Sequence, residues 1–98
     1  MKVLLQFWEE SERGWGVRPD GASLHIDKIS FETYVKDIYK GRNSNIVPNE
    51  YDRTVGSILG AIVNDDIYKI LLERGSLRLA QYELNNLIKL EDIVIDVN

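Results

Sequence analysis

The sequence predicts one α+β domain built on an antiparallel sheet, with an N-terminal hairpin and two to three helices. A chain of 98 residues is long enough for one hydrophobic core but too short to divide it between two. Short runs of β-branched and aromatic residues alternate with stretches whose apolar residues recur at helical spacing. A Pro-Asp-Gly sequence near the N-terminus is typical of a turn between strands. We therefore treat residues 1–98 as a single domain.

The N-terminal part of the chain carries the hairpin signal. Residues 3–8 favour a strand and are too few for a helix, and the acidic residues 9–12 are expected to end that strand. Residues 15–18 and 22–26 flank Pro19-Asp20-Gly21, which we interpret as the turn of the hairpin. Alternation along the second arm gives two faces, with Ala22, Leu24 and Ile26 on one and Ser23 and His25 on the other.

The first helix follows this arm. Asp27 or Ser30 is a suitable N-cap, the apolar residues that follow recur at helical spacing as far as Lys40, and Gly41 is placed to end the helix. Residues 42–50 are mostly polar and are expected to form a surface connection.

The second half alternates between strands and helices. Residues 57–63 favour a buried strand, because Gly60 lowers helix propensity. Residues 66–74 then form a helix capped by Asp65 and ended by Gly75. The expected elements after it are a strand at 77–79, a helix over 80–88 and a final strand at 93–97, at a sheet edge or a subunit contact.

Composition excludes several classes of function. Twelve Lys and Arg against sixteen Asp and Glu give a net charge of −4, which argues against binding a nucleic-acid polymer or a membrane surface. The chain has no cysteine and a single histidine, so neither thiol catalysis nor a Cys/His metal site is expected, and no cofactor is implied. No apolar run approaches the ~20 residues of a membrane span. These features favour a soluble protein of a reducing cytoplasm.

Trp15 is the most informative residue for ligand binding. It lies between Gly14 and Gly16, so its indole has little neighbouring side chain to pack against. A presented indole stacks on heteroaromatic bases with about 1–3 kcal/mol per stack. Arg18, three residues further on, can hold a phosphate through two parallel hydrogen bonds. The alternative is that Trp15 covers the edge of the core and that Arg18 is an ordinary surface residue.

Ser23, His25 and Asp27 share a face if the strand continues, in the order of a hydrolytic triad. Alternate residues of a strand are about 6.5–7 Å apart, which we take to be too far for a nucleophile and its base to meet. We therefore expect no catalytic residues. The apolar excess of residues 58–72 predicts subunit association.

The pattern W-G-x-R-x-D-G-x-S-x-H at residues 15–25, a Tyr-bearing helix and the segment Val47-Pro48-Asn49-Glu50-Tyr51-Asp52-Arg53 together resemble a family of small phage proteins, the Thoeris anti-defence sponges. The resemblance covers roughly the first 53 residues. It implies a non-enzymatic protein, acting in the cytoplasm of the infected bacterial host, that sequesters cyclic ADP-ribose isomers made by host TIR-domain proteins. It also implies a homodimer or higher homo-oligomer.

The resemblance further implies roles for individual residues. Trp15 would stack on the adenine, Arg18 or Arg53 would hold the pyrophosphate, and Ser23 and His25 would hydrogen-bond ribose or phosphate. Arg78 would contribute from the C-terminal half. The ligand-binding residues expected on this basis are Trp15, Gly16, Arg18, Ala22, Ser23, His25, Arg53 and Arg78.

Two other functions remain open. The acidic residues 9–12 favour a phage inhibitor that blocks a host defence complex by mimicking nucleic acid, as anti-CRISPR proteins do. A small phosphodiesterase that uses His25 is the third hypothesis. Charge reversal in residues 9–12 tests the second hypothesis, and chemical change of a bound ligand tests the third.

Overall fold

The computed structural model describes residues 1–12, 16–38, 40, 46–48 and 58–96. Six strands form one antiparallel sheet in the order β5-β2-β1-β4-β6, with β3 paired to the outer half of β1. The strands are β1 (Lys2–Glu12), β2 (Gly16–His25), β3 (Ile46–Pro48), β4 (Ile58–Ile62), β5 (Ser76–Leu79) and β6 (Ile93–Asp96). The helices in this part of the chain are α1 (Lys28–Asp37), α3 (Asp65–Arg74), α4 (Gln81–Leu87) and the 3₁₀ turn η2 (Leu90–Asp92).

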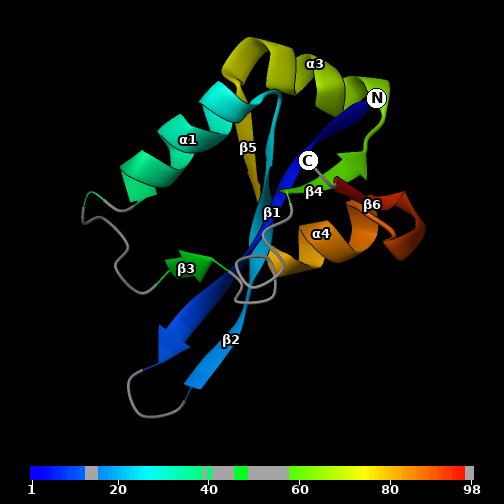
Figure 1. Ribbon diagram of the computed structural model, residues 1–98. Coiled ribbons are helices and arrows are strands. Elements are labelled where there is room, and N and C mark those ends of the chain that lie inside the picture. The colour runs from blue at the N-terminus through cyan, green and yellow to red at the C-terminus, as the bar shows by residue number, and fades with distance from the viewer. Residues whose placement is uncertain (13–15, 39, 41–45, 49–57, 97–98) are drawn as a thin grey trace.

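This architecture confirms the predicted α+β fold with its antiparallel sheet and N-terminal hairpin. The paired ends of β1 and β2 extend beyond the helices as a long arm (Figure 1). Strands β4 and β5 and helices α3 and α4 lie where the sequence predicts them, and β6 forms an edge of the sheet. Gly75 ends α3 at a φ of +83°, as expected.

One face of the sheet carries the hydrophobic core. Val3 and Leu5 of β1 lie beside Ala61 and Leu59 of β4, and Leu5 also pairs with Leu24 of β2. The side chains of α3 and α4 that complete this cluster are Ile67, Leu71 and Leu84. Because side chains alternate along a strand, the opposite face presents a different set, which includes Gln6, Trp8, Ser23 and His25. Helix α1 covers that second face, since its Phe31 and Tyr34 rings contact His25.

The predicted turn at Pro19-Asp20-Gly21 is wrong. Strand β2 continues through these residues without a turn. It contains a β-bulge at this point, where Trp8 of β1 lies opposite both Asp20 and Gly21. Gly21 has a φ of +75°, the conformation that a bulge of this kind requires. Pro-Asp-Gly therefore encodes a bulge here, and the acidic residues 9–12 extend β1 instead of ending it, because they pair with β2 as far as Glu12.

Three smaller predictions also need correction. Asn64, not Asp65, caps α3, because its side chain accepts the Ile67 N–H. Residues 46–48 form strand β3 and not part of a loop, since they pair with β1. Of the two predicted caps of α1, Asp27 and Ser30, the structure shows Asp27. The helix ends at Asp37 rather than Lys40, and residues 38 and 40 have π-helical form. Gly41, the predicted stop, lies outside the described residues.

Candidate functional site

A chain of buried hydrogen bonds crosses the α1-covered face of the sheet. The indole N–H of Trp8 donates to Ser23 Oγ at 2.7 Å, and Ser23 Oγ lies 2.7 Å from His25 Nε2. On the other side of the imidazole, His25 Nδ1 lies 2.7 Å from Ser76 Oγ. The Ser76 hydroxyl donates to the backbone carbonyl of Ser30 at 3.3 Å. Strands β1, β2 and β5 and helix α1 thus meet at one polar network.

The direction of these bonds fixes the state of the imidazole. Since Ser76 gives its proton to Ser30, we assign the His25 proton to Nδ1, which donates to Ser76. Nε2 then accepts from Ser23, which in turn accepts from Trp8. The other tautomer leaves the Ser23 proton without an acceptor at a fully buried site, at a cost of about 1–3 kcal/mol. The neutral Nδ1–H imidazole therefore satisfies every member of the chain.

Burial reinforces this neutral state. His25 is fully enclosed, and desolvation lowers its pKa from 6.5 to about 4. The Phe31 and Tyr34 rings close over it, with each ring centroid 5.1 Å from that of the imidazole. Tyr34 also contacts Trp8, at a centroid distance of 6.1 Å. The imidazole is thus held in place by both hydrogen bonds and aromatic packing.

Ser23 and His25 do meet, so the prediction that they lie too far apart is wrong. Alternate backbone positions are far apart, but the imidazole is long enough to lean along the strand and reach the serine hydroxyl. Asp27 is no third member, because it caps α1 and accepts from the Ser30 N–H. The contact with Ser30 lowers the pKa of the Asp27 carboxyl. His25 has instead Ser76 on its second nitrogen, to which it donates.

Arg78 lies at the outer end of the same face. It pairs directly with Ser23 in the β2–β5 register, and its guanidinium carbon is 5.8 Å from the centroid of the Trp8 ring. Nη2 donates to the backbone carbonyl and the carboxylate of Asp20, the latter at 2.8 Å. Nη1 is buried and has no hydrogen-bond partner in the described structure, although the side chain as a whole is 29% exposed. Arg78 is therefore a well-held cation with hydrogen-bonding capacity left over.

Arg18 lies away from this network, on the projecting hairpin arm. Its Nε and Nη2 both donate to Glu10 Oε2, at 3.0 and 2.7 Å. The Arg18 side chain is 62% exposed, so this ion pair contributes little to folding. At this point of the arm the carboxylate of Glu10 is therefore paired with Arg18 and does not form an unpaired acidic surface.

The structure brings together three of the residues predicted from sequence, namely Ser23, His25 and Arg78. Ala22 is fully buried on the opposite, apolar face. Gly16 begins β2 at a φ of +90° with open space around it. Trp15 and Arg53 lie outside the described residues. Ser23 and His25 are fully buried. Their contribution to this face is to hold Trp8 and Ser76 in position through hydrogen bonds.

Sequence reasoning misses Trp8 and Ser76. The local pattern assigns Trp8 only to a strand, yet its indole N–H anchors the buried chain. Ser76 precedes Arg78 by two residues, so alternation along β5 puts both on one face. That alternation is a usable signal for Ser76, because Arg78 is itself a candidate from the sequence.

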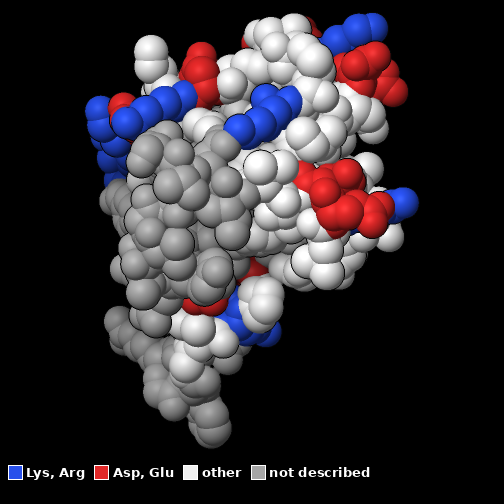
Figure 2. Space-filling view, turned by 45° about the vertical axis from the view of Figure 1, so that its right-hand side comes forward, with Lys and Arg blue, Asp and Glu red and all other residues white. Residues whose placement is uncertain are grey.

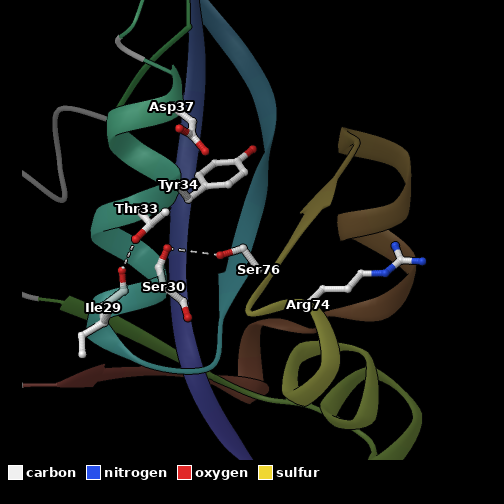
Figure 3. A pocket seen from close by; sticks show the side chains of 7 residues that line it. All are labelled: Ile29, Ser30, Thr33, Tyr34, Asp37, Arg74 and Ser76. Atoms are coloured by element: carbon white, nitrogen blue, oxygen red, sulfur yellow. Dashed lines mark hydrogen bonds between the residues drawn. The ribbon is translucent and has the colours of Figure 1, made fainter.

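A cavity of about 360 Å³ opens beside the buried chain, between α1 and the start of β5. Its wall includes Ser76 and, from α1, the side chains of Thr33, Tyr34 and Asp37 (Figure 3). Arg74 also lines it, but its guanidinium is directed away from these side chains. A second cavity, of about 320 Å³, lies between α4 and Phe7 and has mostly apolar walls.

The surface in Figure 2 carries both signs of charge in small separate groups, with uncharged surface between them. Among the described residues, no three His, Asp or Glu side chains gather where they could hold a metal ion. None of the helices in this part of the chain is long and apolar enough to cross a membrane.

The chain matches no protein-family model, no curated protein and no solved structure.

Proposed function

We propose that the protein is a single ligand-binding domain that sequesters a compact cyclic ADP-ribose-type nucleotide without cleaving it. The observation that carries this proposal is the position of Arg78, a partly exposed guanidinium held between Trp8 and Asp20 whose Nη1 has no hydrogen-bond partner in the described structure. Phosphate oxygens are strong acceptors for a preorganised guanidinium. The chain's net charge of −4 does not oppose this, because one aimed cation serves a small ligand.

The buried chain supports a positioning role for Ser23 and His25. Ser23 holds the indole N–H of Trp8, and His25 holds Ser23. Trp8 in turn carries the Arg78 guanidinium on its face. A site whose members are fixed in advance loses less conformational entropy when a ligand binds. In this proposal, Trp15 stacks on the base.

The enclosure of His25 favours binding over cleavage. A general base needs a free lone pair within reach of the proton that it removes. The lone pair of His25 is taken up by Ser23, and its N–H faces Ser76. A serine that donates to an imidazole is the bond a nucleophile and its base make, but a phosphodiesterase would also need substrate to reach Ser23 and His25, and both are fully enclosed.

The inhibitor alternative depends on an acidic arm. Glu10, in the middle of the acidic residues 9–12, is paired with Arg18, which reduces the negative charge presented there. We therefore retain sequestration as the proposed function. Action in the cytoplasm of an infected bacterium, as a phage anti-defence protein and a homo-oligomer, belongs to the same proposal. The exposed Ile62 and Leu72 are candidates for a subunit contact.

Calorimetric titration with cyclic ADP-ribose isomers tests the proposal. We expect saturable binding of at least one isomer. The Arg78→Gln variant should bind that isomer with a dissociation constant at least about tenfold higher, because it loses a charged hydrogen bond. Arg74→Gln is the matched control, since this arginine is exposed and makes no ion pair in the described structure. Thermal melting of both variants separates lost binding from lost folding.

The same samples address cleavage. Ligand released by heat denaturation should have an unchanged mass, and an altered mass would favour the phosphodiesterase. Heats that equal buffer dilution for every isomer would show the proposed function to be wrong.

A further inference from the structure

The cavity between α1 and β5 has a chemistry of its own, separate from that of Arg78. We propose that it binds a neutral sugar ring. The inference rests on which hydrogen-bonding groups the cavity walls offer, and it does not depend on the proposed nucleotide function. Figure 3 shows the side chains that carry it.

Tyr34 and Asp37 supply the two open polar groups. They are one turn apart on α1 and therefore lie on the same face of the helix. Both extend from α1 into the cavity, with the Asp37 carboxylate beside the Tyr34 ring (Figure 3). Neither the Tyr34 hydroxyl nor the Asp37 carboxylate has a hydrogen bond to any part of the chain that the structure describes. Both remain available to a ligand.

The other hydroxyls of the wall present oxygen lone pairs. Thr33 donates its proton to the Ile29 carbonyl at 2.9 Å, and Ser76 donates to the Ser30 carbonyl. Ser76 also accepts from His25, which leaves one lone pair on its oxygen. With the Asp37 carboxylate, the wall is thus rich in acceptors. It suits a ligand with several hydroxyl donors spread over its surface.

The remaining surfaces favour an uncharged ring. Asp37 repels an anion, and Arg74, the cation among the described residues of the wall, points its guanidinium away. The ring of Tyr34 provides apolar surface for the C–H groups of a sugar. Tyr34 is held in place by its contacts with His25 and Trp8, so this surface is formed in advance. A volume of about 360 Å³ lies near the lower end of the usual range for ligand pockets, which matches a single ring.

Nuclear magnetic resonance titration of the whole ¹⁵N-labelled protein tests this inference. The neutral probes are methyl β-D-ribofuranoside and D-glucose, and the charged probes are ribose 5-phosphate and tetramethylammonium. We expect saturable shifts of the amides of Ser30, Thr33, Tyr34 and Ser76 with at least one neutral sugar. Millimolar affinity is enough, because few hydrogen bonds are made.

Two variants on the same helix sharpen the test. Asp37→Asn should weaken sugar binding about tenfold, because it replaces a charged acceptor by a neutral amide. Glu32→Gln is the matched control, since Glu32 is exposed on α1 outside the cavity wall, and it should bind as the unmodified protein does.

Three results would overturn the inference. The first is the absence of saturable shifts with either neutral sugar, and the second is saturable shifts that map away from α1 and β5. The third is tighter binding of ribose 5-phosphate or tetramethylammonium than of the neutral sugars. None of these results bears on calorimetry with cyclic ADP-ribose isomers, so the two proposals fail separately.

Discussion

At the scale of single residues, His25 determines how the polar face is held together. A fully buried imidazole with a serine on each nitrogen is stable only when neutral, because protonation gives both nitrogens a proton. Ser23 would then accept from both Trp8 and His25, and its own proton would have no acceptor. The polar network therefore makes folding sensitive to acid.

We expect the free energy of unfolding to fall as the pH is lowered from 6.5 toward 4. In this window the unfolded chain binds a proton at His25 while the folded chain does not, because burial lowers the folded pKa to about 4. The lowered pKa of His25 contributes about 3 kcal/mol to the free energy of unfolding above pH 6.5, and this contribution is lost as the pH falls to 4. Urea unfolding at several pH values measures it.

His25→Gln is the control for this prediction, because it removes the titrating group and should flatten the slope between pH 6.5 and 4. Asp27 acts in the same direction only at lower pH, since its carboxyl pKa is lowered from 3.8 by Ser30. An equal slope in both proteins would contradict the assignment to His25.

At the scale of elements, the bulge in β2 decides where the polar face is built. It lies opposite Trp8, whose indole bonds to Ser23, and the Asp20 carboxylate within it pairs with Arg78. The bulge depends on Gly21, whose φ of +75° is unfavourable for other residues. A Cβ at this position would also collide with the backbone carbonyl of Leu79.

Gly21→Ala should therefore destabilise the protein by more than Gly16→Ala. Both glycines have positive φ, which costs a substituted residue about 1–3 kcal/mol. Only Gly21 has a neighbouring strand where the new Cβ would lie, since Gly16 has open space. Thermal unfolding of the two variants measures the difference. Equal losses would show that the contact between β2 and β5 adjusts without cost.

At the scale of the whole molecule, the sheet separates two kinds of packing. Helices α3 and α4 pack on the apolar face, whereas α1 covers the hydrogen-bonded face. Most of the burial of apolar surface lies on the α3 and α4 side, so we expect this side to supply most of the stability. The α1 side, with fewer apolar contacts, is then free to carry a site.

A pair of adjacent leucines in α3 tests this division. Leu71 is fully buried, and Leu71→Ala should cost about 2–5 kcal/mol of unfolding free energy. Leu72 is 61% exposed, and Leu72→Ala should change stability by less than about 0.5 kcal/mol. Denaturant titration of both variants gives the comparison. A large loss from Leu72→Ala would instead place that side chain in a subunit contact.

Local patterns in the sequence are sufficient to predict most of the elements, because helices and strands of this length follow such patterns. Asp27 and Gly75 mark helix ends through their own chemistry, and the apolar residues of α3 and β4 reveal their buried faces. Alternation along a strand is likewise enough to place Ser23 and His25 on one face.

The contents of that face depend on tertiary pairing. Trp8, Ser76 and Arg78 come from strands on either side of β2, and the order of strands in a sheet is not encoded in any local pattern. The same limit explains the bulge, because Pro-Asp-Gly suits a turn and a bulge equally, and pairing with β1 selects between them. Local periodicity therefore determines which segments form helices and strands, whereas long-range strand pairing determines which side chains meet at the site.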